Sequence, residues 1–392
     1  MFPPIRTGTS FYSLKLAETL CTQGHDVTVV TTENKEANDP NYDFEFQRIS
    51  ALHIPLKNYF NHWRLCSIFP SNYIILSRLI KRRRIQIIIL INHYLDIVFP
   101  VLAAAFLNKI PVVISVGTQL QSLNPFKNKL LNVLDRLICG RFVFPFCDKV
   151  VAWDTEISRY LQNIHGNSVI EKTAIINYGV YGDTASMMSH VHNYSLKGQI
   201  LGVGAVSEQR SFVPLVEAFA LVAKDFPEVI LKIIGHIYYD AAVKRAEELG
   251  IADRVIFTGE LDHRSVISEL KRSDLYFASL TGIYTGLGTA TIESMLLGIP
   301  TIANVPADLL GKAVLDDMIN IVLCETTSPR TIADRIRTIM TSEELRVNIG
   351  RNGRTFIVEN LNWKKVAKDM DELLNSVISE HKSTEYQRPS LS

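Results

Sequence analysis

A glycine-rich segment in the second half of the chain carries the clearest chemical pattern. Residues 281–304 read TGIYTGLGTATIESMLLGIPTIAN, in which Gly286 and Gly288 lie in a turn and Thr289 is placed to cap the following helix. Backbone N–H groups at a helix start, with the positive end of the helix dipole, attract phosphate oxygens. Glu293, about one turn inside that helix, can accept hydrogen bonds from two neighbouring sugar hydroxyls. A purely structural strand-to-helix turn has the same appearance, so both interpretations stay open.

The strands and helices that must position this segment alternate along the chain. Apolar runs bounded by turn residues alternate with segments of helical period, which is typical of α/β folds whose parallel sheets are covered on both faces. The first series predicts one doubly wound, Rossmann-like domain. Its expected strands are Asp26–Thr31, Ile85–Ile91, Pro111–Val116 and Lys149–Ala152, and its expected helices are Ser10–Thr22, Leu95–Leu107 and Pro125–Cys139.

A second series begins near Gln199 and predicts another doubly wound domain. Ligands of such folds bind beyond the carboxyl ends of the strands, so we expect two such domains to face a central cleft. The expected domains are 1–185 and 195–360, followed by a helix at 361–380 that crosses the hinge and a disordered tail at 381–392. The expected strands are Ile200–Val203, Val229–Ile234, Val255–Thr258, Leu275–Ala278, Thr301–Ile302 and Ile321–Val322, and the helices are Val213–Lys224, Tyr239–Leu249, Arg264–Lys271, Ala290–Leu297, Pro329–Met340, Glu343–Phe356 and Trp363–Ser379.

Length and composition exclude several classes of protein. A chain of 392 residues with 47% apolar and 21% charged residues fits two globular domains and excludes collagen-like, disordered and small disulfide-stapled proteins. A formal net charge of +1 argues against a nucleic-acid partner. The five cysteines show no zinc-binding spacing, and no secretory signal is visible, so we expect a cytoplasmic protein without a metal site. The apolar region Ile85–Val116 is too interrupted to span a bilayer.

Positive charge concentrates in the first half of the chain. Positions 46–149 hold 14 basic and three acidic residues, including the run Lys81–Arg84. This run is typical of a solvated loop, with contact to an anionic membrane surface as the alternative interpretation. Aromatic residues nearby favour peripheral contact with the inner face of a membrane, and they are Tyr59, Phe60, Trp63 and Phe69.

The order of several motifs resembles one known family. Pro3-Pro4 precedes Thr7-Gly8, and then follow LAETLCTQGHDVTVVTT, LGVGAVSEQRSFVPLVEAFA, DRVIFTGEL and ESMLLGIPTIA. This order is similar to that of the family-4 retaining glycosyltransferases of the GT-B fold, from Pro3 to about Ser376. The resemblance implies transfer of a sugar from a nucleotide-diphosphate sugar to an acceptor hydroxyl, as in polysaccharide or lipid-linked precursor synthesis. It implies no cofactor and no metal.

The resemblance also implies roles for single residues. Glu293 matches the second Glu of the family's Glu-x₇-Glu motif, which contacts the ribose hydroxyls of the donor, whereas the first Glu falls on Thr285. Arg210 matches the family's diphosphate-binding lysine and becomes the chief catalytic cation. The arginine that accompanies this lysine in the family is replaced by Ala205.

Further positions lie in turns and supply backbone groups or ring nitrogens. Gly8 matches the second glycine of the family's phosphate-binding loop, and Gly117 falls where the family carries a histidine near the reacting sugar. His93 matches another histidine on the acceptor side, with a structural role as its alternative, and His236 is expected at the nucleotide base. The helix-start N–H groups expected on the donor phosphates are those of Gly286, Leu287, Gly288 and Thr289.

The N-terminus departs from the family pattern in a different way. Family members begin with a buried strand just before the Pro-Pro loop, and this sequence begins at that loop. We therefore expect the first N-terminal strand to be missing, which leaves a slot with unpaired N–H and C=O groups in the first sheet. Either the sequence starts late or another segment fills the slot.

The three departures at Ala205, Gly117 and Thr285 leave alternatives open. The protein can be an enzyme whose donor-sugar contacts have moved elsewhere, or a non-catalytic nucleotide-binding or scaffolding subunit. A sugar-nucleotide epimerase on the same two-domain plan is a third alternative, and the matched motifs favour a transferase over it.

Overall fold

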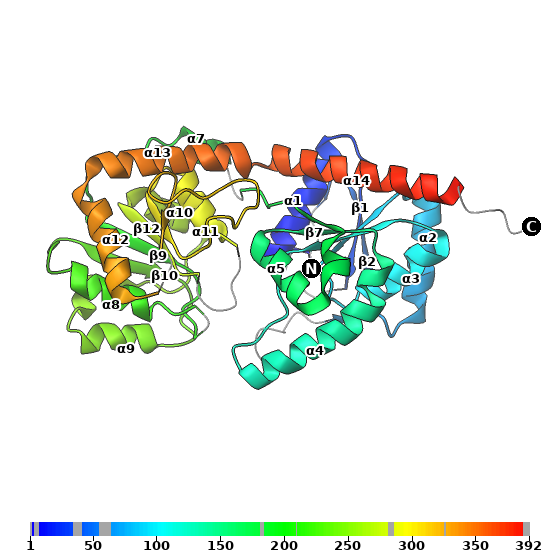
Figure 1. Ribbon diagram of the computed structural model, residues 1–392, viewed down its shortest axis with the longest axis horizontal. Coiled ribbons are helices and arrows are strands. Elements are labelled where there is room, and N and C mark those ends of the chain that lie inside the picture. Colours follow the sequence, from blue (N-terminus) through cyan, green and yellow to red (C-terminus); the bar gives the residue numbers. More distant parts are fainter. Residues whose placement is uncertain are drawn as a thin grey trace, which may run out of the picture. The chain divides into compact units, whose positions relative to one another are not determined.

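The chain divides into two α/β units (Figure 1). The first comprises Met1–Tyr178 and Trp363–Ser392, and the second comprises Gly179–Asn362. This computed structural model describes residues 2–3, 8–33, 41–54, 64–180, 184–208, 210–280, 286–324 and 327–386. Within these ranges, no helix contains an apolar stretch long enough to cross a membrane.

The main sheet of the first unit has four parallel strands in the order β5-β6-β7-β8. Every residue of β6 is buried, as expected of a parallel strand covered on both faces. Because the strands are parallel, the turns after β5 and β6 meet at one edge of the sheet. The strands are β5 (Ile88–Ile91), β6 (Val112–Val116), β7 (Lys149–Ala152) and β8 (Thr173–Ile175).

Helices of the first unit have recognisable start signals. The Asn124 side chain accepts a hydrogen bond from Lys127 N at 3.0 Å, and Pro125 occupies the first position of α4. The last helix, α14, packs on α1, and its Asp371 Oδ1 lies 3.0 Å from Nε2 of His25, in the turn that follows α1. The helices are α1 (Gly8–Thr22), α2 (Pro70–Arg83), α3 (Val98–Asn108), α4 (Pro125–Phe142), η1 (Phe144–Phe146), α5 (Thr155–His165), α6 (Asn167–Ile170) and α14 (Trp363–Tyr386).

A second parallel pair stands apart from the main sheet of the first unit. Strands β1 (Thr28–Thr32) and β2 (Glu45–Ile49) pair with each other, and β1 does not pair with β5. A cavity of about 440 Å³ is lined by residues of both β1 and β5. The expected slot for a missing first strand is thus confirmed within the part of the chain that the structure describes. Two short antiparallel strands, β3 (Leu52–His53) and β4 (Arg64–Leu65), complete this unit.

The sheet of the second unit is parallel, in the order β11-β10-β9-β12-β13-β14. This is the doubly wound order that the sequence predicts, with its switch point between β9 and β12. Aliphatic side chains from these strands and the helices around them form one buried core. The strands are β9 (Gln199–Val203), β10 (Ile230–Ile234), β11 (Val255–Phe257), β12 (Leu275–Ala278), β13 (Thr301–Ala303) and β14 (Val322–Leu323).

The helices of the second unit surround this sheet (Figure 1). Asp262 caps α10 by accepting a hydrogen bond from Ser265 N at 3.0 Å. The helices are α7 (Thr184–Ser189), α8 (Val213–Val222), α9 (Ala241–Glu248), η2 (Ala252–Arg254), α10 (His263–Arg272), α11 (Thr289–Leu296), α12 (Pro329–Thr341) and α13 (Glu343–Asn360).

The basic run at Lys81–Arg84 is not the loop that the sequence suggested. Lys81, Arg82 and Arg83 form the last turn of α2, and Arg84 ends the helix in the left-handed conformation with φ 51°. Arg82 and Arg83 both form ion pairs with Glu45 on β2, so two of the four charges are partly neutralised. Of the aromatic residues near this run, Phe69 is described, whereas Tyr59, Phe60 and Trp63 lie outside the described residues.

Candidate active site

The glycine-rich turn of the second unit leads into α11 at the switch point of the sheet. Gly286 and Gly288 have φ values of 78° and 74°, a conformation that glycine adopts without strain. Gly288, and not Thr289 as expected, caps the helix, because Ile292 N donates to Gly288 O at 3.2 Å. Leu287 is buried. The turn therefore leaves the first N–H groups of α11 without partners inside the helix. Thr285 lies outside the described residues.

Glu293 is buried on α11 and contacts a histidine that sequence reasoning missed. Its Oε1 lies 2.8 Å from Nε2 of His263, the first residue of α10. Burial raises the pKa of the Glu293 carboxyl, and the His263 contact opposes this rise only in part. The same contact raises the pKa of His263 against the effect of burial. Both pKa shifts favour a proton shared by the two side chains. The His263 side chain is half-exposed, whereas that of Glu293 is buried.

Arg210 packs against the carboxyl end of β9. Gly204 has φ 150°, and a Cβ atom placed on it would lie 2.1 Å from Arg210 Nη1, so the guanidinium occupies the space beside this glycine. Ser207 Oγ fixes the loop by accepting a hydrogen bond from Arg210 N at 3.1 Å. Burial raises the pKa of Tyr276 to about 12, and both the Arg210 and the Glu293 charge act on this phenol. Arg210 follows β9, and Glu293 lies on α11, which follows β12, so the predicted cation and carboxylate both lie at the switch point of the sheet.

The neighbouring strand end carries the residues expected at a nucleotide base. A Cβ atom on Gly235, after β10, would lie 2.0 Å from Gly204 O, so the close approach of these two turns requires glycine at position 235. His236 follows with an exposed side chain, and its ring centroid is 4.4 Å from that of Tyr238. These rings present an exposed aromatic surface at the same edge of the sheet as Arg210.

Turns of the first unit converge on a buried asparagine. Asn92 follows β5 with φ 64°, and its Oδ1 accepts a hydrogen bond from Gly117 N at 3.1 Å. Its Nδ2 lies 3.4 Å from Oγ1 of Thr9, in the first turn of α1. Gly8 begins α1 with an exposed Cα and open space where a side chain would project. Asn92, which sequence reasoning did not select, therefore joins the ends of β5 and β6 to the start of α1.

Gly117 has a physical reason for lacking the histidine that the resemblance implies. A Cβ atom here would lie 2.1 Å from the ring of Trp153. Trp153 is held in place because its Nε1 donates to Ser115 Oγ at 2.8 Å and its ring packs 4.2 Å from that of Tyr12. The indole therefore occupies the space that any side chain at position 117 would need.

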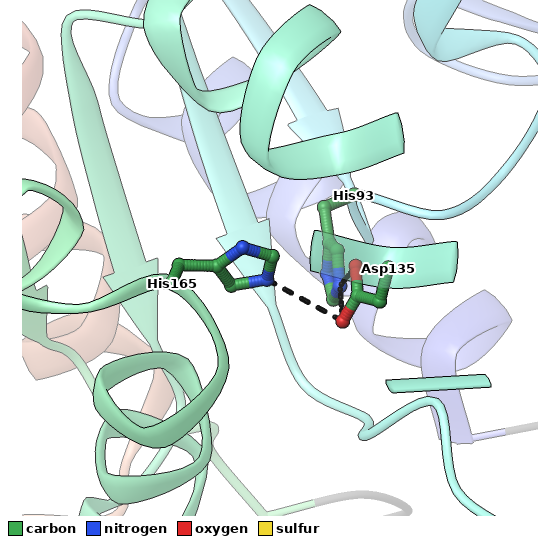
Figure 2. Close-up of side chains that lie close together, drawn as sticks. All are labelled: His93, Asp135 and His165. Atoms are coloured by element: carbon green, nitrogen blue, oxygen red, sulfur yellow. Dashed lines mark hydrogen bonds and ion pairs between the residues drawn. The ribbon is translucent and has the colours of Figure 1, made fainter. Parts of the chain in front are cut away.

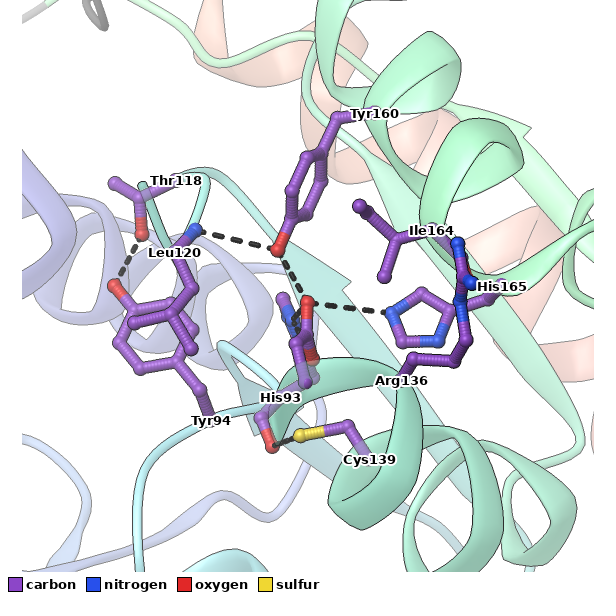
Figure 3. Close-up of polar contacts among 10 residues, drawn as sticks. His93, Tyr94, Thr118, Leu120, Arg136, Cys139, Tyr160, Ile164 and His165 are labelled. Atoms are coloured by element: carbon purple, nitrogen blue, oxygen red, sulfur yellow. Dashed lines mark hydrogen bonds and ion pairs between the residues drawn. The ribbon is translucent and has the colours of Figure 1, made fainter. Parts of the chain in front are cut away.

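His93 is buried in a polar cluster and does not face solvent. Figure 2 shows the imidazoles of His93 and His165 pointing at the Asp135 carboxylate. His93 Nε2 lies 3.2 Å from Asp135 Oδ1, and His165 Nε2 lies 3.4 Å from Oδ2. Tyr160 donates its hydroxyl hydrogen to the same carboxylate. In the wider network of Figure 3, Cys139 Sγ contacts His93 O.

The electrostatics of this cluster favour a structural role. Burial alone raises the pKa of Asp135, but the His165, His93 and Tyr160 contacts together lower it well below its usual range. The ring nitrogens and the carboxylate oxygens lie within 4.8 Å of one another, which is close enough for shared metal ligands. Among the described residues, Nδ1 of both histidines, Nε2 of His165 and Oδ1 of Asp135 are buried without a hydrogen-bond partner, so the network is only partly satisfied. The side chain of His93 is thus buried in this cluster, which favours the structural alternative over contact with an acceptor.

Two family descriptions match the chain. "Glycosyltransferase Family 4" matches residues 6–181, and "Glycosyl transferases group 1" matches residues 191–356. With the doubly wound sheets, these matches define the class as glycosyltransferases of the GT-B fold. The chain belongs to the family-4, group 1 glycosyltransferases.

Named relatives are similar over different parts of the chain. It is 28% identical over 264 residues to an uncharacterized glycosyltransferase of Methanocaldococcus jannaschii, covering 65% of this chain and 64% of that protein. The chain thus spans less than two thirds of that relative's length. It is 24% identical over 381 residues to the phosphatidyl-myo-inositol mannosyltransferase of Mycobacterium tuberculosis, covering 94% and 93% of the two chains.

Solved structures share the fold at low sequence identity. A glycosyltransferase from Rickettsia africae superposes with a TM-score of 0.70 at 15% identity, covering 96% of each chain. An Anabaena protein, HepE, in complex with UDP and glucose gives a TM-score of 0.64 at 14% identity, covering 96% of this chain and 98% of that one. At these identities the likeness concerns the fold alone.

Proposed function

We propose that this protein is a retaining glycosyltransferase that moves a sugar from a nucleotide-diphosphate sugar to an acceptor hydroxyl. The observation that carries the proposal is the arrangement of Arg210 and Glu293 at the switch point of the second sheet. A guanidinium packed on Gly204 can bind a diphosphate, and a buried carboxylate one turn inside α11 can bind ribose hydroxyls. The His263 contact keeps that carboxylate in place.

The proposed chemistry is a front-face displacement. The bond from the anomeric carbon to the diphosphate oxygen breaks while the bond to the acceptor oxygen forms on the same face. The acceptor proton passes to the departing phosphate oxygen, so no separate base is needed. Arg210 and the N–H groups at the start of α11 stabilise the negative charge that develops on the leaving diphosphate.

The donor and acceptor classes are also proposals. A neighbour of the same fold is described with UDP and glucose, which supports a nucleotide-diphosphate sugar as donor. One relative is named for a phosphatidyl-inositol acceptor, and positions 46–149 of this chain are rich in bases. We therefore place the acceptor on a lipid-linked or otherwise anionic precursor, met by a cytoplasmic protein at the inner face of a membrane.

A non-catalytic nucleotide-binding or scaffolding subunit is the second candidate. It is favoured by the Trp153 ring, which excludes a side chain at Gly117, and by Ala205 in place of the family's arginine. Removing one hydrogen-bond donor that stabilises developing charge typically lowers the rate about 10²- to 10³-fold. The departures at Gly117 and Ala205 are therefore expected to slow turnover.

Calorimetric titration with UDP, GDP and ADP tests the assigned site. Charge-assisted hydrogen bonds contribute about 1.5–3 kcal/mol, so Arg210→Ala should weaken diphosphate binding roughly 10- to 150-fold. Arg330→Ala, an exposed cation at the start of α12, serves as the matched control and should leave affinity unchanged. An unaltered nucleotide affinity in Arg210→Ala would show that Arg210 does not bind the diphosphate. Tight nucleotide binding without turnover across a donor and acceptor panel would favour the non-catalytic subunit.

A further inference from the structure

Helix α4 presents an apolar stripe to solvent. The stripe consists of Phe126, Leu130, Leu134, Leu137, Ile138 and Phe142, all of which have exposed side chains. Their spacing of three, four and one residues places them along one side of the helix. Phe126 is 79% exposed and Phe142 is 58% exposed, so the stripe is open at both of its ends.

The opposite side of α4 already has partners. Asp135 and Cys139 are buried in the cluster with His93, and α4 packs against η1 and α5. The apolar stripe is therefore not the core-facing side of the helix. A helix of 18 residues is about 27 Å long, so the exposed stripe covers a substantial length of surface.

A second pair of exposed rings adds to the apolar surface of this unit. Phe146 lies just beyond α4 in η1, and its ring is 6.2 Å from that of Phe106 at the end of α3. Phe106 is 71% exposed. η1, which contacts α4, and α3, which contacts η1 through these rings, thus also leave aromatic side chains in water, where such clusters usually mark a binding surface.

The charges on α4 have one sign. Lys127, Lys129, Arg136 and Arg141 are exposed, whereas Asp135, the single acidic residue of the helix, is buried. Lys129 and Arg136 border the stripe on one side, whereas Lys127 and Arg141 project from the same side as the stripe, in the first and last turns of the helix. An exposed apolar stripe bordered by bases is typical of a helix that lies in the plane of an anionic lipid surface.

A second copy of the chain fits this helix less well. Pairing two copies of α4 would bring basic residues together with no exposed acid on the helix to oppose them. Anionic lipid headgroups supply the opposite charge, and the acyl region accepts the phenylalanines and leucines. Charge complementarity therefore selects a lipid surface over self-association.

We propose that α4 docks the protein on an anionic membrane surface, with the stripe inserted between the headgroups. The functional reason for this docking rests on the proposed function, because an enzyme bound to the membrane surface could reach an acceptor carried on a lipid. The docking itself needs neither donor nor acceptor. Its failure in a vesicle assay is therefore distinguishable from a failure of sugar transfer.

Flotation of the full chain with vesicles tests this proposal. We expect binding to vesicles of phosphatidylcholine with 30% phosphatidylglycerol, weaker binding at high salt, and little binding to phosphatidylcholine alone. The variant Leu130→Gln/Leu137→Gln should reduce binding by at least about tenfold. The matched control Val191→Gln/Ile319→Gln removes exposed apolar residues of the second unit and should bind like the parent protein.

A charge variant keeps the test independent of folding defects. Lys127→Ser/Lys129→Ser should weaken binding roughly fivefold for each lysine removed. Circular dichroism and thermal unfolding should match the parent protein for all variants, because every altered side chain is exposed. Absence of binding to anionic vesicles, or equal binding by the parent and the stripe variant, overturns the proposal. A dimer in sedimentation velocity that Leu130→Gln/Leu137→Gln abolishes would assign the stripe to a second copy instead.

Discussion

Single residues decide how this site departs from the family pattern. Gly117 is required by the neighbouring Trp153 ring, whereas Gly204 has φ 150° and lies against the end of the Arg210 side chain. The sequence shows the glycine at each position, but it does not show which side chain occupies the space beside that glycine. Arg210 and Glu293 were predicted as donor contacts, whereas Asn92 and His263 were not. Their types and spacing matched no motif, although Asp262 before His263 is an ordinary helix-start signal.

The close packing at Gly117 predicts a stability defect. Replacing it with alanine would place a methyl group 2.1 Å from the Trp153 ring, so Gly117→Ala should lower the free energy of unfolding by about 1–3 kcal/mol. Gly8→Ala is the control, because no atom lies within 4 Å of the new Cβ, and its effect should stay within about 0.5 kcal/mol. Urea denaturation measures both variants. Equal midpoints for both would show that Trp153 moves aside freely.

The Glu293–His263 pair predicts a specific titration. In the parent protein the His263 pKa should lie above 6.5, and in Glu293→Gln it should return towards that value. The stabilisation from the pair is present below pH 6.5 and is lost as the pH rises through the higher pKa of the folded state. NMR titration of the imidazole C–H signals measures this shift. An unchanged His263 signal in the variant would contradict the contact.

At the scale of helices and strands, most elements could be predicted from the sequence. The strands of the second unit are short apolar runs between turns, and α11 starts where its glycine turn predicts. In the first unit α2 and α5 were missed, although Asp154 caps α5 and Pro70 begins α2. These helices lie in stretches read as loops or left unassigned. The sequence therefore carries local start signals for both helices.

The slot between β1 and β5 predicts that an added strand stabilises the first unit. The pocket of about 440 Å³ between these strands offers room for a further strand, whose backbone could pair with both. Fusing the β6 sequence VVISV ahead of Met1 should raise Tm by roughly 2–4 °C for each kcal/mol gained, since Phe2 already lines the cavity.

Hydrogen exchange gives the strand fusion its control. Amides of Val29 on β1 and Ile89 on β5 should gain protection in the fused chain, because both line the slot. A fusion of equal length reading VPIPV cannot donate the same hydrogen bonds and should change neither exchange nor Tm. Stabilisation by both fusions alike would mean that the slot does not select a strand.

At the scale of the whole molecule, the C-terminal helix belongs with the N-terminal unit. α14 packs on α1, and the Trp363 ring lies 5.8 Å from that of Tyr12. A chain ending at Asn362 should therefore lose hydrogen-exchange protection in α1 while β9 keeps its protection. A chain ending at Tyr386, which removes only residues 387–392, is the control and should match the parent protein. Equal loss in β9 and α1 would show that the two units unfold together.

The sequence by itself determined the family and the doubly wound character of the second sheet, because period, turn residues and motif order are local properties of a chain. Tertiary structure alone decided which side chains meet. His263 reaches Glu293 across 30 positions, and His93 reaches Asp135 across 42. It also decided which side of α4 stays in water, since helical period shows that a helix has two faces but not which one the rest of the chain covers.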